Sequence, residues 1–160
     1  MSSSRSGDTA GVELAAEMDA PCSPAALFTY IDDLDDYPAW MGLVHRATRI
    51  QPDTGELPRW DVELRARIGP FARSKRLVMA RTSFDQDRLA VFERRESDGR
   101  RHSLWRLTAA IEPRGAGSHL LMRLHYGGSL WTGGVAERVL HDEINRSRDR
   151  LLSLIGETTR

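Results

Sequence analysis

The five histidines of this 160-residue chain are the side chains best suited to metal binding or proton transfer near neutral pH. They are His45, His102, His119, His125 and His141. No two of them have the i, i+4 spacing that places two metal ligands on one helix face, and neither H-x-x-x-H nor H-E-x-x-H occurs. The sequence therefore predicts no metal site.

Other motifs that carry catalytic chemistry are also missing from the sequence. It contains no G-x-S-x-G elbow, phosphate-binding glycine loop or dinucleotide fingerprint, so no hydrolase, nucleotide-binding function or cofactor is predicted. Cys22 is the single cysteine, which excludes an intrachain disulfide and favours a reducing, cytoplasmic compartment. The acidic run 32–36 lacks the glycine and distal glutamate of a calcium loop, so helix capping is predicted there.

Two polar residues remain as candidates for catalysis. Tyr126 ends the last predicted strand on its apolar face, and Arg73 shares a phase with Leu77 and Met79. Such groups could polarise a carbonyl or move a proton inside an apolar interior. The register of the strand that contains Arg73 is ambiguous, and a hydroxyl bonded to backbone is the commoner role of a buried tyrosine. The sequence leaves open whether any reaction is catalysed.

The longest element that can position such residues is a helix predicted over Trp131–Ile155. At 100° per residue, Leu140, Ile144, Ser147 and Leu151 fall on one apolar stripe of that helix. A run of about 22 residues spans roughly 33 Å, which is the width of a small domain. We therefore expect this helix to cross a whole sheet.

A seven-stranded sheet is predicted from extended segments separated by clusters of Gly, Pro, Asp and Ser. The connections after the second strand are short, which favours an antiparallel meander. Apolar residues on one face alternate with arginines and acidic residues on the other, so ion pairs are expected on a solvated outer face. The predicted strands are Val12–Met18, Val44–Gln51, Arg59–Ile68, Ala72–Arg81, Arg88–Arg95, Arg101–Ile111 and His119–Tyr126.

Two short helices are predicted between the first two strands. Ser23 is a good N-cap and Pro24 suits the first helical position, so one helix should begin there. A second is predicted near Tyr37–Met41, ending at Gly42.

The composition is that of one ordinary globular domain, with 40% hydrophobic residues and 23 basic residues balanced by 23 acidic ones. This balance argues against a nucleic-acid partner, which usually requires a positive field. No window approaches 18 apolar residues, so a soluble protein without a membrane span is expected.

The stretch 21–44, PCSPAALFTYIDDLDDYPAWMGLV, resembles the N-terminal signature of the polyketide cyclase/dehydrase and lipid-transport branch of the START-like (SRPBCC) superfamily. Its Tyr-Pro-x-Trp step after an acidic turn carries the likeness, which extends over about Val12–Ile155. The resemblance implies an α+β helix-grip fold, in which a curved seven-stranded antiparallel sheet surrounds the long C-terminal helix. One domain is expected over 12–156, with a disordered tail at 1–11 and a short tail at 157–160.

The resemblance also implies an elongated apolar cavity between the sheet and the long helix. The small inward residues Ala66, Ala109 and Ser147 support such a hollow, and apolar pockets of this kind bind hydrophobic ligands. Its entrance is expected beside residues 127–134. The predicted ligand-binding residues are Val62, Leu64, Leu77, Met79, Trp105, Leu107, Met122, Leu124, Tyr126, Trp131, Leu140, Ile144, Ser147 and Leu151.

Three functions follow as hypotheses. The first is binding of a small hydrophobic molecule, such as a lipid, a polyketide or another aromatic or isoprenoid metabolite. The second is a polyketide aromatase/cyclase that acts on a poly-β-ketone with Tyr126 and Arg73. The third is a toxin-like or ribosome-interacting module, motivated by the many arginines. The sequence does not distinguish a monomer from a homodimer.

Overall fold

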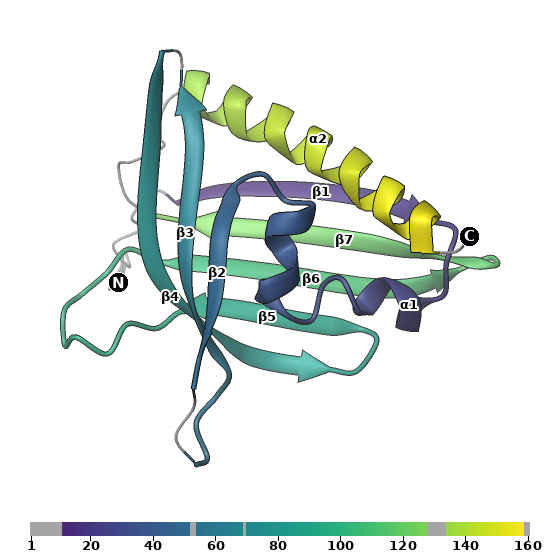
Figure 1. Ribbon diagram of the computed structural model, residues 1–160, viewed down its shortest axis with the longest axis horizontal. Helices are drawn as coiled ribbons and strands as arrows, with labels where there is room; N and C mark the ends of the chain where they lie inside the picture. Colours follow the sequence, from purple (N-terminus) through teal and green to yellow (C-terminus); the bar gives the residue numbers. More distant parts are fainter. Residues whose placement is uncertain (1–10, 52–53, 69, 128–133, 159–160) are drawn as a thin grey trace, which may run out of the picture.

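The computed structural model describes residues 11–51, 54–68, 70–127 and 134–158, apart from the side chains of residues 68, 134–137 and 140. In this part of the chain, a curved sheet of seven strands is crossed by one long helix (Figure 1). The elements in chain order are β1 (Val12–Ala20), α1 (Pro24–Phe28), the 3-10 helix η1 (Leu34–Ala39), β2 (Val44–Ile50), β3 (Arg59–Ile68), β4 (Phe71–Asp85), β5 (Leu89–Arg94), β6 (Trp105–Arg114), β7 (Gly117–Tyr126) and α2 (Gly134–Thr158).

The strand order β1-β7-β6-β5-β4-β3-β2 makes β1 and β2 the two edges of the sheet. Every neighbouring pair is antiparallel, and β1 pairs with β7 from Val12 opposite Tyr126 to Ala20 opposite Ser118. The chain passes from one edge to the other through α1 and η1. This is the predicted α+β helix-grip arrangement.

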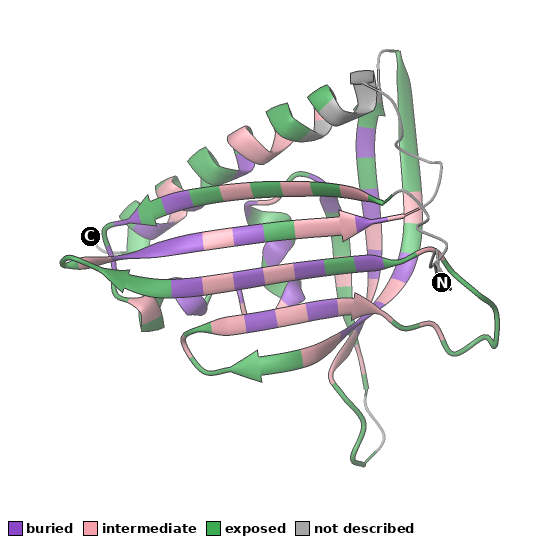
Figure 2. Cartoon of the chain, turned by 180° about the vertical axis from the view of Figure 1, so that it is seen from behind, coloured by how far each residue is buried: buried purple, intermediate pink, exposed green. Residues whose placement is uncertain are grey.

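The inner face of the sheet carries the apolar phase of each strand, as the alternation predicts. In β3, Trp60, Val62 and Leu64 are buried, and Figure 2 shows buried residues recurring along the strands. Pairing of Lys75 with Leu64 resolves the register of β4, since it places Lys75 on this inner face. The regular period of two therefore fixes which side of the sheet forms the core.

The outer face is held by ion pairs, as expected. Ten arginines of the described residues lie within 4.0 Å of a carboxylate, although four of them, Arg49, Arg94, Arg146 and Arg150, are on the inner phase of the sheet or on α2. Arg76 on β4 reaches Asp61 on β3 at 2.8 Å, for example. Pairing with neighbouring acids thus accounts for much of the arginine content.

The two N-terminal helices are fixed by capping and by side-chain hydrogen bonds. The Ser23 hydroxyl accepts a bond from the backbone of Ala26 at 3.2 Å, as predicted for an N-cap. Asp33 caps η1 and also accepts a bond from the Trp60 indole at 3.0 Å. The buried Tyr37 hydroxyl donates to the Ile31 carbonyl at 2.9 Å. The acidic run is therefore a capping element, and it ties η1 to the sheet.

Some predicted boundaries differ from those of the structure. β6 begins at Trp105 and not at Arg101, because side-chain bonds from Arg94 to Ser103 and from His102 to Asp98 hold the preceding segment as a loop. β4 continues to Asp85, and α2 continues to Thr158. None of the described helices combines the length and apolarity that a membrane crossing requires.

Candidate functional site

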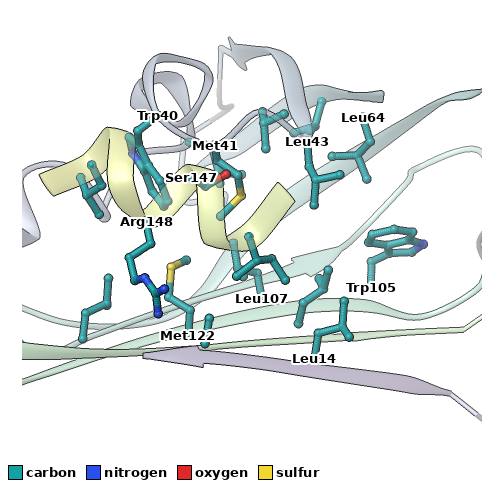
Figure 3. A pocket seen from close by; sticks show the side chains of 18 of the residues that line it. Leu14, Trp40, Met41, Leu43, Leu64, Trp105, Leu107, Met122, Ser147 and Arg148 are labelled. Carbon is teal, nitrogen blue, oxygen red and sulfur yellow. The ribbon is translucent and has the colours of Figure 1, made fainter. Parts of the chain in front are cut away.

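In the described part of the structure, an apolar cavity of about 100 Å³ lies between the inner face of the sheet and α2 (Figure 3). It receives side chains from every strand except β5, from η1 and the segment after it, and from α2. The lining residues are Leu14, Ala16, Glu17, Met18, Leu34, Trp40, Met41, Leu43, Val44, Val62, Leu64, Leu77, Met79, Trp105, Leu107, Leu120, Met122, Leu124, Ile144, Ser147, Arg148 and Leu151.

Four methionines lie among these residues, namely Met18, Met41, Met79 and Met122. The whole chain has five. An unbranched thioether side chain changes rotamer easily and contacts aromatic rings favourably. The lining can therefore adjust its shape to a guest without moving the backbone.

The helix α2 is held over the cavity by a close approach at Gly42. The Gly42 amide donates a bond to the Ser147 hydroxyl at 3.3 Å, and this hydroxyl donates to the Glu143 carbonyl at 2.8 Å. A Cβ at residue 42 would meet the ends of the Glu143 and Arg150 side chains, which would have to shift to make room for it. Ser147 therefore serves to dock α2, and both hydrogen-bonding roles of its hydroxyl are used.

Glu17 lines the cavity from the edge strand β1, but its carboxylate is engaged on the outer face. There His119 lies between Asp19, with Nδ1 to Oδ1 at 2.7 Å, and Glu17, with Nε2 to Oε2 at 2.9 Å. The bond to Asp19 is the main cause that raises the pKa of His119, against the opposing effect of burial. The same bond lowers the pKa of Asp19. This arrangement is a clasp between β1 and β7, which we call the His119 clasp.

A group of polar side chains lies beside Trp105, outside the cavity lining. The Lys75 amine lies 5.9 Å from the centroid of the Trp105 ring, and Arg94 forms an ion pair with Glu96 at 2.7 Å. Burial, followed by the nearby Arg94 charge, lowers the pKa of Lys75. Lys75 itself is not a lining residue. This group forms the polar end of an otherwise apolar interior.

A sequence profile for polyketide cyclase/dehydrase and lipid transport proteins matches residues 11–155. The chain belongs to this family. The motif at 21–44 predicts this polyketide cyclase/dehydrase and lipid-transport branch, and the match confirms that prediction.

Several solved structures share this fold at low sequence identity. A START superfamily protein from Mycobacterium smegmatis superposes with a TM-score of 0.67 at 14% identity, over 91% of this chain and 98% of that one. The Zhui aromatase/cyclase from Streptomyces sp. R1128 gives 0.65 at 9% identity, over 94% and 96%. The di-domain ARO/CYC StfQ of the steffimycin pathway gives 0.65 at 14%, over 93% and 52%. No curated protein matches the chain.

Within this START-like fold, the structure brings eleven of the predicted ligand-binding residues to the cavity wall. Their role in binding remains a prediction. These residues are Val62, Leu64, Leu77, Met79, Trp105, Leu107, Met122, Leu124, Ile144, Ser147 and Leu151.

The remaining predicted site residues form two groups. Some are described but do not line the cavity, and the others lie outside the described residues. Tyr126 is buried and stacks on Trp105 with ring centroids 4.8 Å apart, but Trp105 lines the cavity and Tyr126 does not. Arg73 is on the inner phase of β4, opposite Ala66, but lies exposed near the end of the strand. Trp131, the side chain of Leu140 and most of the predicted entrance at 127–134 lie outside the described residues.

The small residues proposed to create the hollow are only partly involved. Ala66 and Ala109 are buried in packed parts of the core and do not border the cavity, whereas Ser147 and Ala16 do. The structure has a cavity, as predicted, but the cavity lies closer to β1 than the positions of Ala66 on β3 and Ala109 on β6 suggested.

The sequence missed two groups of lining residues. β1 was predicted as a strand with Leu14 and Ala16 on one face, but its place beside β7 depends on topology. Trp40, Leu43 and Val44 reach the cavity because the chain turns under α2 after η1. In hindsight, the apolar phase of β1 was the signal that could have added its residues.

Proposed function

We propose that this family member binds a small hydrophobic molecule in the cavity beneath α2 and acts as a carrier for it. The observation that supports this function is the nature of the wall. Of the 22 lining residues that the structure describes, only Glu17, Ser147 and Arg148 are polar, and the first two are engaged with other groups. Such a wall favours an apolar guest through the hydrophobic effect.

The cavity volume limits the size of the guest. A dry apolar cavity of about 150 Å³ is known to accept benzene or xenon. The cavity of about 100 Å³ beneath α2 is close to that value. A single aromatic ring or a short branched alkyl group fits this size, whereas a multi-ring polyketide requires α2 to move away from the sheet.

The aromatase/cyclase alternative has less support from the geometry. Tyr126 stacks on Trp105, and Arg73 is exposed near the start of β4, and neither residue lines the cavity. Among the described lining residues, none is placed as a free general acid or base. A turnover assay on a poly-β-ketone with Tyr126→Phe would test this alternative, since an unchanged rate removes the proposed catalytic role of the hydroxyl.

The ribosome-interacting alternative was based on the number of arginines. Ten of the described arginines pair with carboxylates, and the basic and acidic residues of the chain balance at 23 each. Binding to ribosomes that persists at high salt would support this alternative, and loss at modest salt would indicate nonspecific attraction.

A titration with toluene tests the binding function, with the methyl groups of the lining methionines followed by NMR. Toluene should shift the signals of Met18, Met79 and Met122 and should saturate. Ala16→Phe should abolish these shifts because Ala16 lines the cavity and a benzyl group would fill it. Ala15→Phe is the matched control, since the neighbouring alanine is exposed on the other face of β1.

Mass spectrometry of lipid extracts from the purified protein would identify the natural guest. Equal toluene shifts in the wild type and in Ala16→Phe, or no shifts in the wild type, would contradict the proposed function.

A further inference from the structure

Arg148 on α2 is the one lining residue whose charge has no counter-ion among the residues that the structure describes. Figure 3 shows its side chain extending from α2 toward the sheet. The residue lines the cavity and is also exposed to solvent. It therefore lies at a boundary between the apolar interior and water.

The acids that could neutralise Arg148 are engaged elsewhere. Glu143, one turn earlier on α2, holds Arg146 at 3.0 Å and Arg150 at 3.2 Å. Glu17, on the facing edge strand, holds His119 at 2.9 Å. Neither carboxylate lies within 4.0 Å of the Arg148 guanidinium, so its donors remain available.

The other polar groups near the cavity cannot serve as an anchor in the same way. The Ser147 hydroxyl is used by Gly42 and by the Glu143 carbonyl. Lys75 lies over the Trp105 ring, outside the lining, and it shares its surroundings with the Arg94 and Glu96 pair. Arg148 is thus the polar group that a guest in the cavity would meet.

We propose that Arg148 binds the carboxylate of an amphipathic guest, so that the ligand is a small aromatic or branched aliphatic acid. The apolar body would occupy the cavity among Leu107, Met122 and Leu124, and the carboxylate would lie at the solvent boundary. A planar guanidinium binds the two oxygens of a carboxylate with two parallel hydrogen bonds, which favours this anion over a neutral head group. This inference rests on the proposed binding function and specifies its ligand class.

The test compares three probes with the same ring, namely toluene, 4-methylbenzamide and 4-methylbenzoate. In the wild type, 4-methylbenzoate should bind about tenfold more tightly than 4-methylbenzamide, a modest gain because Arg148 is partly hydrated. In Arg148→Gln the ratio of the two dissociation constants should fall to about one. Arg148→Lys should keep an intermediate ratio, because a lysine supplies the charge without the planar fork.

Arg146→Gln is the matched control, since Arg146 is on the same helix but is exposed and paired with Glu143. Its ratio should remain about tenfold, as in the wild type. Because each ratio compares two probes on one variant, a loss of folded protein affects both dissociation constants equally.

An equal preference for the acid in the wild type and in Arg148→Gln, or no preference in the wild type, would overturn the role of Arg148. Toluene separates this failure from that of the proposed function. If toluene binds and the acid shows no advantage, only the carboxylate inference fails; if no probe binds the wild type, the binding function fails with it.

Discussion

Two regions of the same core differ in how completely they are filled. The first, which we call the packed cluster, consists of Leu27, Phe28, Ile31, Tyr37, Trp60 and Phe92, none of which is more than 1% exposed. Phe92 contacts Trp60 and Tyr37 edge-on, with ring centroids 5.6 and 6.1 Å apart. The second region is the cavity wall beneath α2, where Leu14, Leu124 and Ile144 are only half-buried. None of the packed cluster borders the cavity.

This difference separates stability from binding within one sheet. Aromatic rings from α1, η1 and the strands fill the first region at the density of a protein interior, so each contributes strongly to folding. Leucines and methionines line the second region without filling it, and their unused contacts are available to a guest. The packed cluster can therefore hold the sheet in shape while the cavity remains open to a ligand.

The largest expected effect comes from the same truncation made in both regions. Leu27→Ala should lower the free energy of unfolding by about 3–5 kcal/mol, because it opens a new hole in a filled core. Leu124→Ala should cost less than about 2 kcal/mol, because this side chain is half-buried beside an existing hollow. Urea denaturation of both variants measures the difference. Equal losses would show that the two regions are packed alike.

A smaller effect is expected from the acidic cap that joins η1 to the sheet. Asp33→Ala should cost about 1.5–3 kcal/mol, because it removes an N-cap and leaves the Trp60 indole without its acceptor. The control is Asp36→Asn, at a largely exposed position. Partial burial of the Asp36 carboxyl, followed by the charges of Asp33 and Asp35, raises its pKa. Removing that charge should leave the stability unchanged or slightly increase it. A larger loss of stability in Asp36→Asn than in Asp33→Ala would show that Asp33 does not stabilise the junction between η1 and the sheet.

The smallest expected effect concerns the His119 clasp, which holds the cavity strand β1 from outside. The pKa of His119 is raised above its ordinary value of 6.5, so its contribution to stability is present below that pH and is lost as the pH rises through the folded pKa. The pKa of Asp19 is lowered, so its contribution is present above its ordinary value of 3.8 and is lost as the pH falls through the folded pKa.

The stability difference between the wild type and His119→Gln should therefore be greatest between about pH 4 and pH 6.5 and should decrease at higher and lower pH. Urea denaturation within this range, and at pH values above and below it, measures the change, with His45→Gln at an exposed position as the control. A difference that does not change with pH would show that the imidazolium has no part in the clasp.

The sequence predicted most of the fold because its information is local and periodic. The alternation of Trp60, Val62 and Leu64 sets the inner face of β3, and the Ser23-Pro24 pair starts α1 by capping. Both features depend on neighbours in the chain, so they can be recognised without a structure.

The candidate site was predicted less completely because it depends on contacts between distant segments. The stripe of Ile144, Ser147 and Leu151 identified the face of α2, but Arg148 became a candidate only when the structure showed Glu143 and Glu17 occupied. Tyr126 was assigned to the correct face, yet no local pattern could show that it stacks on Trp105 without lining the cavity itself. The alternation of side chains along a strand predicts which face of the sheet a residue is on, but it does not predict whether that residue lines a cavity.

X-ray diffraction from crystals under xenon pressure is the most direct test of an apolar cavity beneath α2 that accepts a guest. Xenon enters apolar cavities of this size without any polar anchor, so its binding does not depend on Arg148. We expect a xenon peak bounded by Leu107, Met122 and Leu124 in the wild type, and no such peak in Ala16→Phe. An absent peak in the wild type, or an equal peak in the filled variant, would contradict the account.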